Sequence, residues 1–303
     1  MDLILYGGDL NMKTKLVYVY VGNDGDYYYD MLMMSLYSFR IYHPNDEVQV
    51  VMDEDTFKWL QKKNAVLLSD VTPIVVHVPE EYSIMQRSRY LKTKLRQIVS
   101  GDFMYIDGDT IICSSLEELD FMDDDLSMVL NLHRKDDFLC RKNLELCKAA
   151  GMDTSSPRPY YNGGVAFVKD VPACYDFYNH WHLLWKKSLT NGVPQDQPAL
   201  CQTNFDLGFP VNEMWGGWNC QVGYGGDINL IRKAKIIHYF SANSWGVMKT
   251  VLMKRIHQGG RVDGLVAVFL SFPRLFFAIR CMKIKLNEYY YIIREKLRIR
   301  RIK

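Results

Sequence analysis

Residues 102–113 read Asp-Phe-Met-Tyr-Ile-Asp-Gly-Asp-Thr-Ile-Ile-Cys, an apolar run that ends at two carboxylates separated by one glycine. The apolar run is typical of a buried β-strand, because it is rich in aromatic and branched side chains. Side chains alternate along extended backbone, so Asp107 and Asp109 should point to the same side, with Gly108 giving the backbone freedom between them. Such a pair suits a hard cation such as Mg²⁺ or Mn²⁺, although Asp-Gly is also a common polar turn.

Strands and helices alternate in the sequence around this stretch. Apolar periodicity predicts strands at 15–22, 47–52, within 66–78, and at 102–106, 110–113, 127–132, 158–168 and 236–240, and helices at 28–42, 56–63, 88–100 and 176–188. The alternation in the first 110 residues predicts a parallel α/β sheet, which binds ligands beyond the carboxyl ends of its strands. Gly22 and Asn23 also lie at the end of a strand, and we therefore expect them at the same edge as the two carboxylates.

Bulk composition is that of a folded protein. The chain has 303 residues, of which 48% are hydrophobic and 24% charged, enough for one large domain with an appendage. Its seven cysteines include no CxxC pair, which predicts reduced, buried thiols in a cytosolic protein. The N-terminus lacks the pattern of a signal peptide.

Charge divides the chain into two parts. Residues 254–303 carry thirteen Lys and Arg against three acids, which leaves 24 basic and 32 acidic side chains to the first 253 residues. We expect a folded domain at 14–250 and a basic amphipathic tail at 251–303. The tail is interrupted by Pro273 and by arginines, so it is not expected to span a membrane.

The tail pattern fits helices lying in the interface of an anionic membrane, which would place the protein in the cytoplasm, peripheral on the inner face of the membrane. The alternative is a helical appendage packed on the domain, or an oligomer contact. Nucleic acid is not expected as a partner, because the body is acidic and shows no recognition motif.

Several short motifs together resemble one enzyme family. They are Ser88-Arg89-Tyr90-Leu91-Lys92-Thr93-Lys94-Leu95, Phe103-Met104-Tyr105-Ile106-Asp107-Gly108-Asp109-Thr110, Leu116-Glu117-Glu118-Leu119, Tyr161-Asn162-Gly163-Gly164-Val165, Asp196-Gln197, Trp218-Asn219 and the pair His238 and Trp245. In this order, over about residues 15–246, the chain resembles glycosyltransferase family 8, which includes glycogenin-like and bacterial lipopolysaccharide galactosyltransferases.

The resemblance implies a GT-A fold, a Rossmann-like mixed sheet with helices on both faces, that binds a nucleotide sugar, usually a UDP-hexose, with Mn²⁺ or Mg²⁺. It implies Asp107, Asp109 and His238 as metal ligands, and two carboxylates with a neutral imidazole suit Mn²⁺. Without the family context, His238 would be interpreted as a core histidine.

The resemblance also implies which residues bind the donor and stabilise the reaction. Val21, Gly22 and Asn23 would meet the nucleobase and ribose, Arg89 or Lys92 the phosphates or sugar, and Asn162 and Gly163 the transferred sugar. Asp196 and Gln197 are the nearest candidates for stabilising an oxocarbenium-like transition state. The alternatives are a simple loop for the first group, a solvated helix face for the second and a turn residue for Asp196.

The implied activity is transfer of a hexose, with retention, to a saccharide or lipid-linked acceptor in surface polysaccharide or lipopolysaccharide synthesis. A nucleotidyltransferase on a similar sheet is one alternative, although the chain lacks a good Gly-rich phosphate loop after its first strand. A non-catalytic, membrane-associated sugar-binding protein is another, because the family's closing His-x-x-Gly-x-x-Lys-Pro-Trp is replaced here. Lys249 is the candidate for the family's phosphate-binding lysine, and Trp215 and Trp218 are either core residues or a platform for a sugar acceptor.

Overall fold

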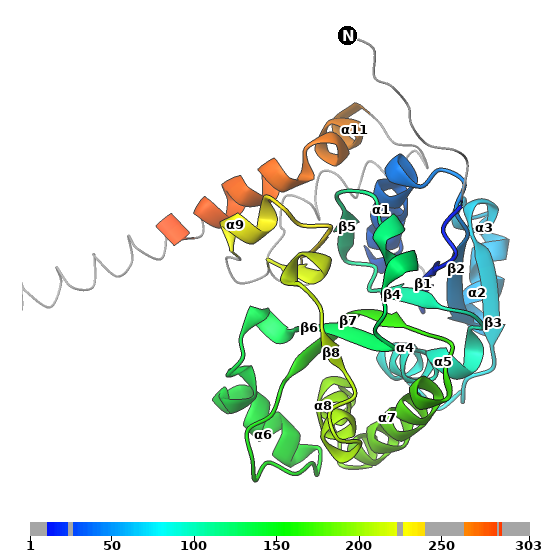
Figure 1. Ribbon diagram of the computed structural model, residues 1–303. Helices are drawn as coiled ribbons and strands as arrows, with labels where there is room; N and C mark the ends of the chain where they lie inside the picture. The colour runs from blue at the N-terminus through cyan, green and yellow to red at the C-terminus, as the bar shows by residue number, and fades with distance from the viewer. Residues whose placement is uncertain (1–10, 24–26, 223–226, 240–263, 284, 287–303) are drawn as a thin grey trace, which may run out of the picture.

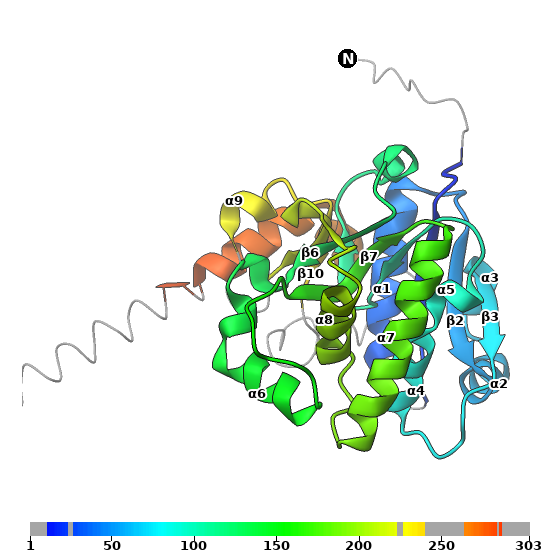
Figure 2. The same ribbon diagram turned by 60° about the horizontal axis from the view of Figure 1, so that its bottom comes forward.

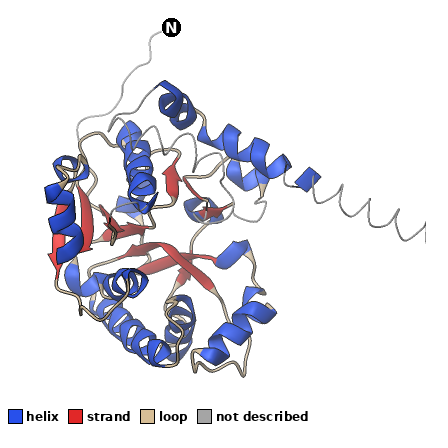
Figure 3. Ribbon diagram, turned by 180° about the vertical axis from the view of Figure 1, so that it is seen from behind, coloured by secondary structure: helices blue, strands red, loops and turns tan. Residues whose placement is uncertain are grey.

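The computed structural model of the chain describes residues 11–23, 27–222, 227–239, 264–283 and 285–286. Its centre is a seven-stranded sheet in the order β3-β2-β1-β4-β7-β6-β8, with helices on both faces (Figures 1 and 3). A second, three-stranded sheet has the order β5-β10-β9. The predicted α/β fold, with a mixed sheet and helices on both faces, is confirmed.

The strands of the large sheet are β1 (Lys15–Val19), β2 (Val48–Asp53), β3 (Thr72–Val76), β4 (Phe103–Ile106), β6 (Leu126–Leu130), β7 (Tyr161–Val168) and β8 (Asn212–Glu213). The first four run parallel, as the alternating pattern predicts, whereas β7 is antiparallel to both β4 and β6. The carboxyl ends of β1, β4 and β6 therefore meet the amino end of β7 at one edge of the sheet. This edge is where such sheets bind ligands.

Alternate residues of the central strands supply two separate cores. Leu16 and Tyr18 of β1 pack on one face of the sheet, while Val17 between them packs on the other, as the two-residue period of a strand requires. The first face is covered by α1 (Tyr27–Tyr42), α2 (Glu54–Lys62), α3 (Leu67–Asp70) and the small sheet of β5 (Thr110–Ile112), β9 (Cys220–Gln221) and β10 (Ile236–His238).

The second face is covered by α4 (Ile84–Thr93), α5 (Leu95–Ile98), α6 (Arg141–Ala149), α7 (Pro172–Thr190) and α8 (Gln197–Asp206). In Figure 2, α7 and α8 lie in front of the sheet and α1 lies behind it. Both cores are dense with large side chains, including the fully buried Trp181 and Trp185 of α7. Both faces of the sheet are therefore covered up to the edge where such sheets bind ligands.

Several helices differ from the local predictions. The strand expected within 66–78 is present as β3, but the short helix α3 before it was not predicted. The helix predicted at 88–100 begins at Ile84 and is divided at Lys94, because Ser83 and Gln86 form a reciprocal capping box that starts the helix earlier. The helices α6 and α8 were not predicted at all; α6 is short, and only Cys147 within it is buried, whereas α8 is buried along most of its length.

The described part of the predicted tail packs on the α1 face. It consists of α11 (Gly264–Ser271) and a second helix at 273–283, which lies along α9 (Ile228–Ile231) in Figures 1 and 2. Phe277 stacks on Tyr239 with ring centroids 6.1 Å apart, and Arg274 donates to the carbonyl of Ala234. Among the described helices, none combines the length and apolarity needed to cross a bilayer. The domain boundary at residue 250 lies outside the described residues and stays a prediction.

All seven cysteines lie in the described part of the chain, and none of them is in a disulfide. Six are buried and Cys140 is partly exposed. Burial raises the pKa of the Cys147 and Cys174 thiols to about 11. They behave as small hydrophobic residues of the core, as the sequence predicts.

Candidate active site

Asp107, Asp109 and His238 converge at the ligand-binding edge of the sheet. The two aspartates lie between β4 and β5, and β10 pairs antiparallel with β5 so that His238 lies opposite Thr110. One potential ligand atom from each of the three side chains lies within 4.8 Å of the other two, and His238 Nε2 is 3.2 Å from Asp109 Oδ1. The three residues that the sequence predicts as metal ligands are therefore brought together.

The space beside this cluster depends on a glycine. A Cβ atom on Gly164 would lie 2.5 Å from His238 Cε1 and 2.6 Å from Asp107 Oδ2, so a larger residue would fill the cluster. Gly164 sits where the pairing of β6 with β7 is irregular, and its carbonyl accepts from the backbone N–H of Asp107 at 2.7 Å. Two carboxylates and one imidazole around a glycine-lined space fit Mn²⁺ or Mg²⁺.

Gly108 lines the cavity described below, but its backbone does not need the freedom of a glycine. Its φ is not in the left-handed region, and a Cβ atom there would make ordinary contacts at 3.6 Å with Leu32. Backbone freedom between the carboxylates is therefore not what the site requires. The glycine that the geometry does require is Gly164, on a strand that pairs with β4.

Electrostatics favour a positive charge at this cluster. Burial disfavours the charged form of His238, but the carboxylates of Asp109 and Asp107 outweigh burial and raise its pKa above the ordinary value. Without a cation, the cluster thus attracts a proton to the imidazole. A divalent cation would compete with that proton for Nε2.

A second charged cluster adjoins the first. The Nζ atom of Lys92 lies 3.4 Å from carboxylate oxygens of both Asp107 and Asp196, and only 5% of its side chain is exposed. Arg89 Nε lies 3.1 Å from Asp196 Oδ1. Burial alone would raise the pKa of Asp196. The positive charges of Lys92 and Arg89 lower it by more than that, so the net shift is downward. Lys92 is therefore buried and does not lie on a solvated helix face. Asp196, predicted as a catalytic residue, contacts Arg89 and Lys92, which were predicted to bind phosphate or sugar.

A cavity of about 310 Å³ opens beside these clusters. It is lined by Val19, Tyr20, Val21, Tyr28, Leu32, Ile84, Met85, Ser88, Arg89, Tyr105, Asp107, Gly108 and Asp109. Five of these residues were predicted from the sequence. Among the rest, Tyr28, Ile84 and Met85 are large and exposed; their only sequence signal is that they lie next to predicted site elements.

Other predicted residues lie outside the cavity lining. The N–H of Gly22 donates to Thr56 Oγ1 at 3.1 Å, and Asn23 is exposed. Gln197 donates to the carbonyl of Tyr161 at the start of β7. These side chains and backbone groups lie near the same edge of the sheet, but their contacts are with the protein itself.

The predicted sugar-binding pair on β7 is buried. Asn162 is 6% exposed, and its Oδ1 accepts from the N–H of Gly164 at 3.0 Å and from Asn219 Nδ2 at 2.9 Å. A Cβ atom on Gly163 would lie 3.2 Å from Leu200 Cδ2. In this structure Asn162 therefore binds neighbouring amides.

The tryptophans of the Gly-rich loop differ from one another. Trp218 is buried in the core, with Lys235 Nζ 5.5 Å from its ring centroid, whereas Trp215 is half exposed. Only Trp215 therefore has surface available for stacking on a ligand. Trp245 and Lys249 lie outside the described residues.

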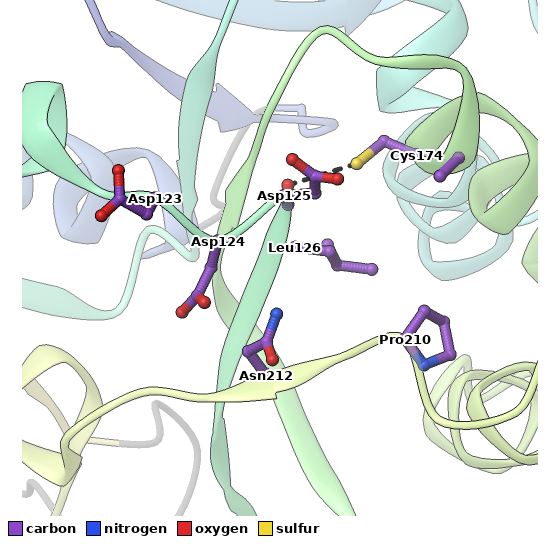
Figure 4. A pocket seen from close by; sticks show the side chains of 8 residues that line it. Asp123, Asp124, Asp125, Leu126, Cys174, Pro210 and Asn212 are labelled. Atoms are coloured by element: carbon purple, nitrogen blue, oxygen red, sulfur yellow. Dashed lines mark hydrogen bonds between the residues drawn. The ribbon is translucent and has the colours of Figure 1, made fainter.

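A second cavity, of about 320 Å³, lies at the opposite edge of the sheet, before the start of β6 (Figure 4). Three consecutive aspartates line it together with the start of α7; Ser127 Oγ donates to the carboxylate of Asp124, and Cys174 Sγ donates to the backbone carbonyl of Asp125. Ligands of such sheets bind at the other edge. The first cavity is therefore the candidate active site.

Comparison with known proteins finds similar structures but no similar sequence. No family model and no curated protein matches the sequence. The glycosyltransferase GlyE of Streptococcus pneumoniae TIGR4 superposes with a TM-score of 0.53 at 15% identity, over 86% of this chain and 62% of that chain. Its apo form gives a TM-score of 0.52 with the same identity and coverage.

Mouse xyloside xylosyltransferase 1, in its apo form, gives a TM-score of 0.48 at 12% identity, over 75% of this chain and 98% of that chain. The chain thus spans less than two thirds of the length of GlyE. At such identities the similarity to GlyE bears on the fold alone. Together with the mixed sheet and its two helical layers, this similarity shows that the chain has a GT-A-like fold.

Proposed function

We propose that this chain is a metal-dependent glycosyltransferase that moves a hexose from a nucleotide sugar, a UDP-sugar in the first instance, to a saccharide or lipid-linked acceptor. The observation that carries the proposal is the convergence of Asp107, Asp109 and His238 at the ligand-binding edge of a GT-A-like sheet, beside a cavity. GlyE, whose structure is similar, is a glycosyltransferase by name.

The cavity has the chemistry that a nucleotide needs. Val21 and the exposed apolar side chains of Tyr28 and Met85 form a surface on which a base and ribose can lie. Asp107 and Asp109 also line the cavity, so a diphosphate bound in it could approach the proposed metal ligands. A divalent cation held there would neutralise the charge that develops on the departing diphosphate.

Two basic side chains complete the electrostatics. Arg89 lines the cavity and Lys92 lies between Asp107 and Asp196. Arg89 can donate to a phosphate or sugar oxygen without leaving Asp196, because a guanidinium has five N–H groups in a planar fork. The lowered pKa of Asp196 keeps it ionised. An ionised carboxylate near the sugar would stabilise positive charge at the anomeric carbon. Gln197, the first residue of α8, would help to hold this carboxylate in place through its hydrogen bond to Tyr161.

For the acceptor, we propose a lipid-linked or surface saccharide presented at an anionic membrane. In the described part of the tail, the second helix exposes an apolar stripe at four- and three-residue intervals, formed by Leu275, Ile279, Met282 and Leu286; Val268 of α11 and Phe272, at the bend between the two helices, are exposed as well. The following sequence, 287–303, is strongly basic. An apolar stripe next to basic residues is the pattern of an interfacial helix. The half-exposed Trp215 is our candidate for contact with the acceptor sugar.

The experiment is a screen of UDP-hexoses for release of UDP, with Mn²⁺, with Mg²⁺ and with a chelator. We expect release that needs the cation and that falls at least about 100-fold in Asp109→Asn, because the variant loses a charged ligand. Asp136→Asn is the matched control, since Asp136 is exposed and pairs only with Arg134 in the described contacts. Nucleotide-sugar binding without turnover in any metal would instead indicate a sugar-binding protein.

A further inference from the structure

A continuous chain of side-chain hydrogen bonds leads away from His238 into the protein. Nδ1 of His238 lies 3.0 Å from Asn219 Oδ1, and Asn219 Nδ2 donates to Asn162 Oδ1 at 2.9 Å. Asn162 Nδ2 donates to Asn131 Oδ1 at 3.0 Å, and Asn131 Nδ2 donates to Asp137 Oδ2 at 2.7 Å. We name Asn219, Asn162, Asn131 and Asp137 the amide relay. All its members except Asn131 are buried, and Asn219 is 0% exposed.

The far end of the amide relay fixes its direction. The carboxylate of Asp137 can only accept, and it accepts from Asn131 Nδ2 and, at 2.8 Å, from Asn143 Nδ2. Asn131 must therefore point its NH₂ group toward Asp137. Its oxygen is then the atom left to accept from the next amide.

The middle of the amide relay is fixed independently by the backbone. The N–H of Gly164 can only donate, and it donates to Asn162 Oδ1 at 3.0 Å. Asn162 must therefore turn its oxygen toward Gly164 and Asn219, so Asn219 turns its NH₂ group toward Asn162. The group that Asn219 presents to His238 is thus its oxygen, which can only accept.

We propose that Asn219, held by the amide relay, is a positioning residue that keeps the proton on Nδ1 of His238 and so presents Nε2 as the metal-binding atom beside Asp109. The proposal rests on the metal site of the proposed function. Histidines that bind metals commonly donate their other ring N–H to a protein acceptor, which fixes the tautomer and the orientation of the ring. Here the acceptor is an amide whose own orientation is set by two groups on other segments.

A second side chain clamps the two segments that carry the relay. Gln221 Oε1 accepts from the N–H of Leu132 at 2.7 Å, and its Nε2 donates to the carbonyl of Leu130 at 2.9 Å. The N–H of Gln221 donates to His133 Nε2 at 3.1 Å. Leu132 and His133 both have positive φ, 52° and 57°, a conformation that non-glycine residues adopt at a cost and that surrounding contacts must maintain. These contacts tie the segment that follows Asn131 to β9, which directly follows Asn219.

The test compares Mn²⁺ affinity, measured by electron paramagnetic resonance of the free ion, in three variants of the full chain. Asn219→Ala removes the acceptor, and we expect its Kd for Mn²⁺ to rise about 10- to 100-fold. Asn219→Asp keeps an oxygen for Nδ1 but loses the donor to Asn162, and we expect it to keep most of the affinity while melting at a lower temperature. Asn204→Ala is the control. Asn204 lies in α8 and is equally buried, but its side chain accepts from the N–H of Val211 and has no contact with the amide relay in the described hydrogen bonds.

Wild-type affinity in Asn219→Ala overturns the positioning role, and so does a loss in Asn219→Asp as large as that in Asn219→Ala. A loss in Asn204→Ala as large as in Asn219→Ala also overturns it, since general destabilisation would then explain both. The wild-type protein gives a second measurement that needs no variant. In its Zn²⁺-loaded form, ¹⁵N spectra of the His238 ring should show a proton on Nδ1 and metal on Nε2, and the reverse assignment refutes the proposal. If the wild type binds neither ion, the metal site of the proposed function fails, which the variants alone would not indicate.

Discussion

His238 Nε2 lies 3.2 Å from Asp109 Oδ1, although the two residues come from strands that are far apart in the sequence. The pairing of β10 with β5 brings them together, and the N–H of Tyr239 donates to the carbonyl of Asp109 at 3.1 Å. The cluster of Asp107, Asp109 and His238 is therefore complete only when the small sheet has formed on the α1 face of the large one. Its two carboxylates are local in sequence, while its imidazole is positioned by long-range pairing.

Substitution of the two glycines on β7 should have unequal effects. Gly164→Ala places a methyl group 2.5 Å from His238 Cε1 and 2.6 Å from Asp107 Oδ2. We expect it to abolish detectable Mn²⁺ binding by electron paramagnetic resonance. Gly163→Ala, whose Cβ atom would meet Leu200 Cδ2 at 3.2 Å, is the neighbouring control and should retain binding. Equal affinity in both variants would show that the cluster is not where the ion binds.

Mn²⁺ binding should strengthen as pH rises. The ion must displace a proton from His238, whose pKa is raised by Asp109 and Asp107 against the effect of burial. Below that raised pKa we expect the affinity to increase by up to about tenfold per pH unit, because one proton is released for each ion bound. Titrations at several pH values measure this slope, and a flat profile in the wild type would argue against His238 as a ligand.

The metal-free protein should show the opposite trend in stability. A group whose pKa is raised on folding contributes stability below its unfolded pKa, about 6.5 for histidine, and loses it as pH rises through the folded pKa. The melting temperature without metal should therefore fall across that window. His238→Gln should remove this dependence, and a melting temperature that still fell equally in the variant would assign the effect to another group.

Lys92→Met should destabilise the fold at neutral pH. The change leaves two carboxylates, those of Asp107 and Asp196, without the buried cation that lies 3.4 Å from each. Breaking a buried ion pair by removing one partner costs about 3 kcal/mol or more, which urea unfolding measures. Lys62→Met, at an exposed lysine of α2, is the control and should change stability by less than about 0.5 kcal/mol.

The cost of Lys92→Met should shrink in acid. The pKa of Asp196 is lowered on folding, so its contribution to stability is present above its unfolded pKa, about 3.9, and is lost as pH falls through the folded pKa. Without Lys92, the carboxyl group of Asp196 can accept a proton in acid, and burying the neutral group costs less free energy than burying the carboxylate. An equal cost at neutral and acid pH would mean that Lys92 contributes through packing and not through its charge.

Membrane binding should depend on the exposed stripe of the tail. Leu275 and Ile279 are 60% and 54% exposed, so Leu275→Asp with Ile279→Asp should leave the fold intact and abolish sedimentation with anionic vesicles. Phe121→Asp, at a side chain that is 82% exposed outside the tail, is the control and should sediment like the wild type. Sedimentation of the double variant, or none of the wild type, would contradict a membrane role for the stripe.

The sequence was most informative where the signal is local. An apolar run ending at Asp107 and Asp109 predicts a strand and two convergent carboxylates, and both are present. The parallel order of the first four strands follows from alternation alone. The earlier start of α4 was also within reach, because Ser83 and Gln86 have the spacing of a capping box.

The parts that could not be predicted depend on contacts between distant segments. Nothing in the pattern around Asn131 or Asp137 links them to His238, because both residues lie in short 3₁₀ turns that no hydrophobic period predicts. Position 164 must be a glycine and position 108 need not be. This difference likewise depends on the neighbours that a Cβ atom would meet. Such requirements become visible only when the strands are paired.

The most direct test of the metal site is a crystal structure of the protein with Mn²⁺ and UDP, using the anomalous signal of manganese to locate the ion. We expect one strong anomalous peak within bonding distance of Asp107, Asp109 and Nε2 of His238, with the diphosphate of UDP on its open side and the base in the cavity beside Val21. UDP bound in that cavity with no manganese peak at the three residues, or a peak at another site, would contradict a metal–diphosphate role for them.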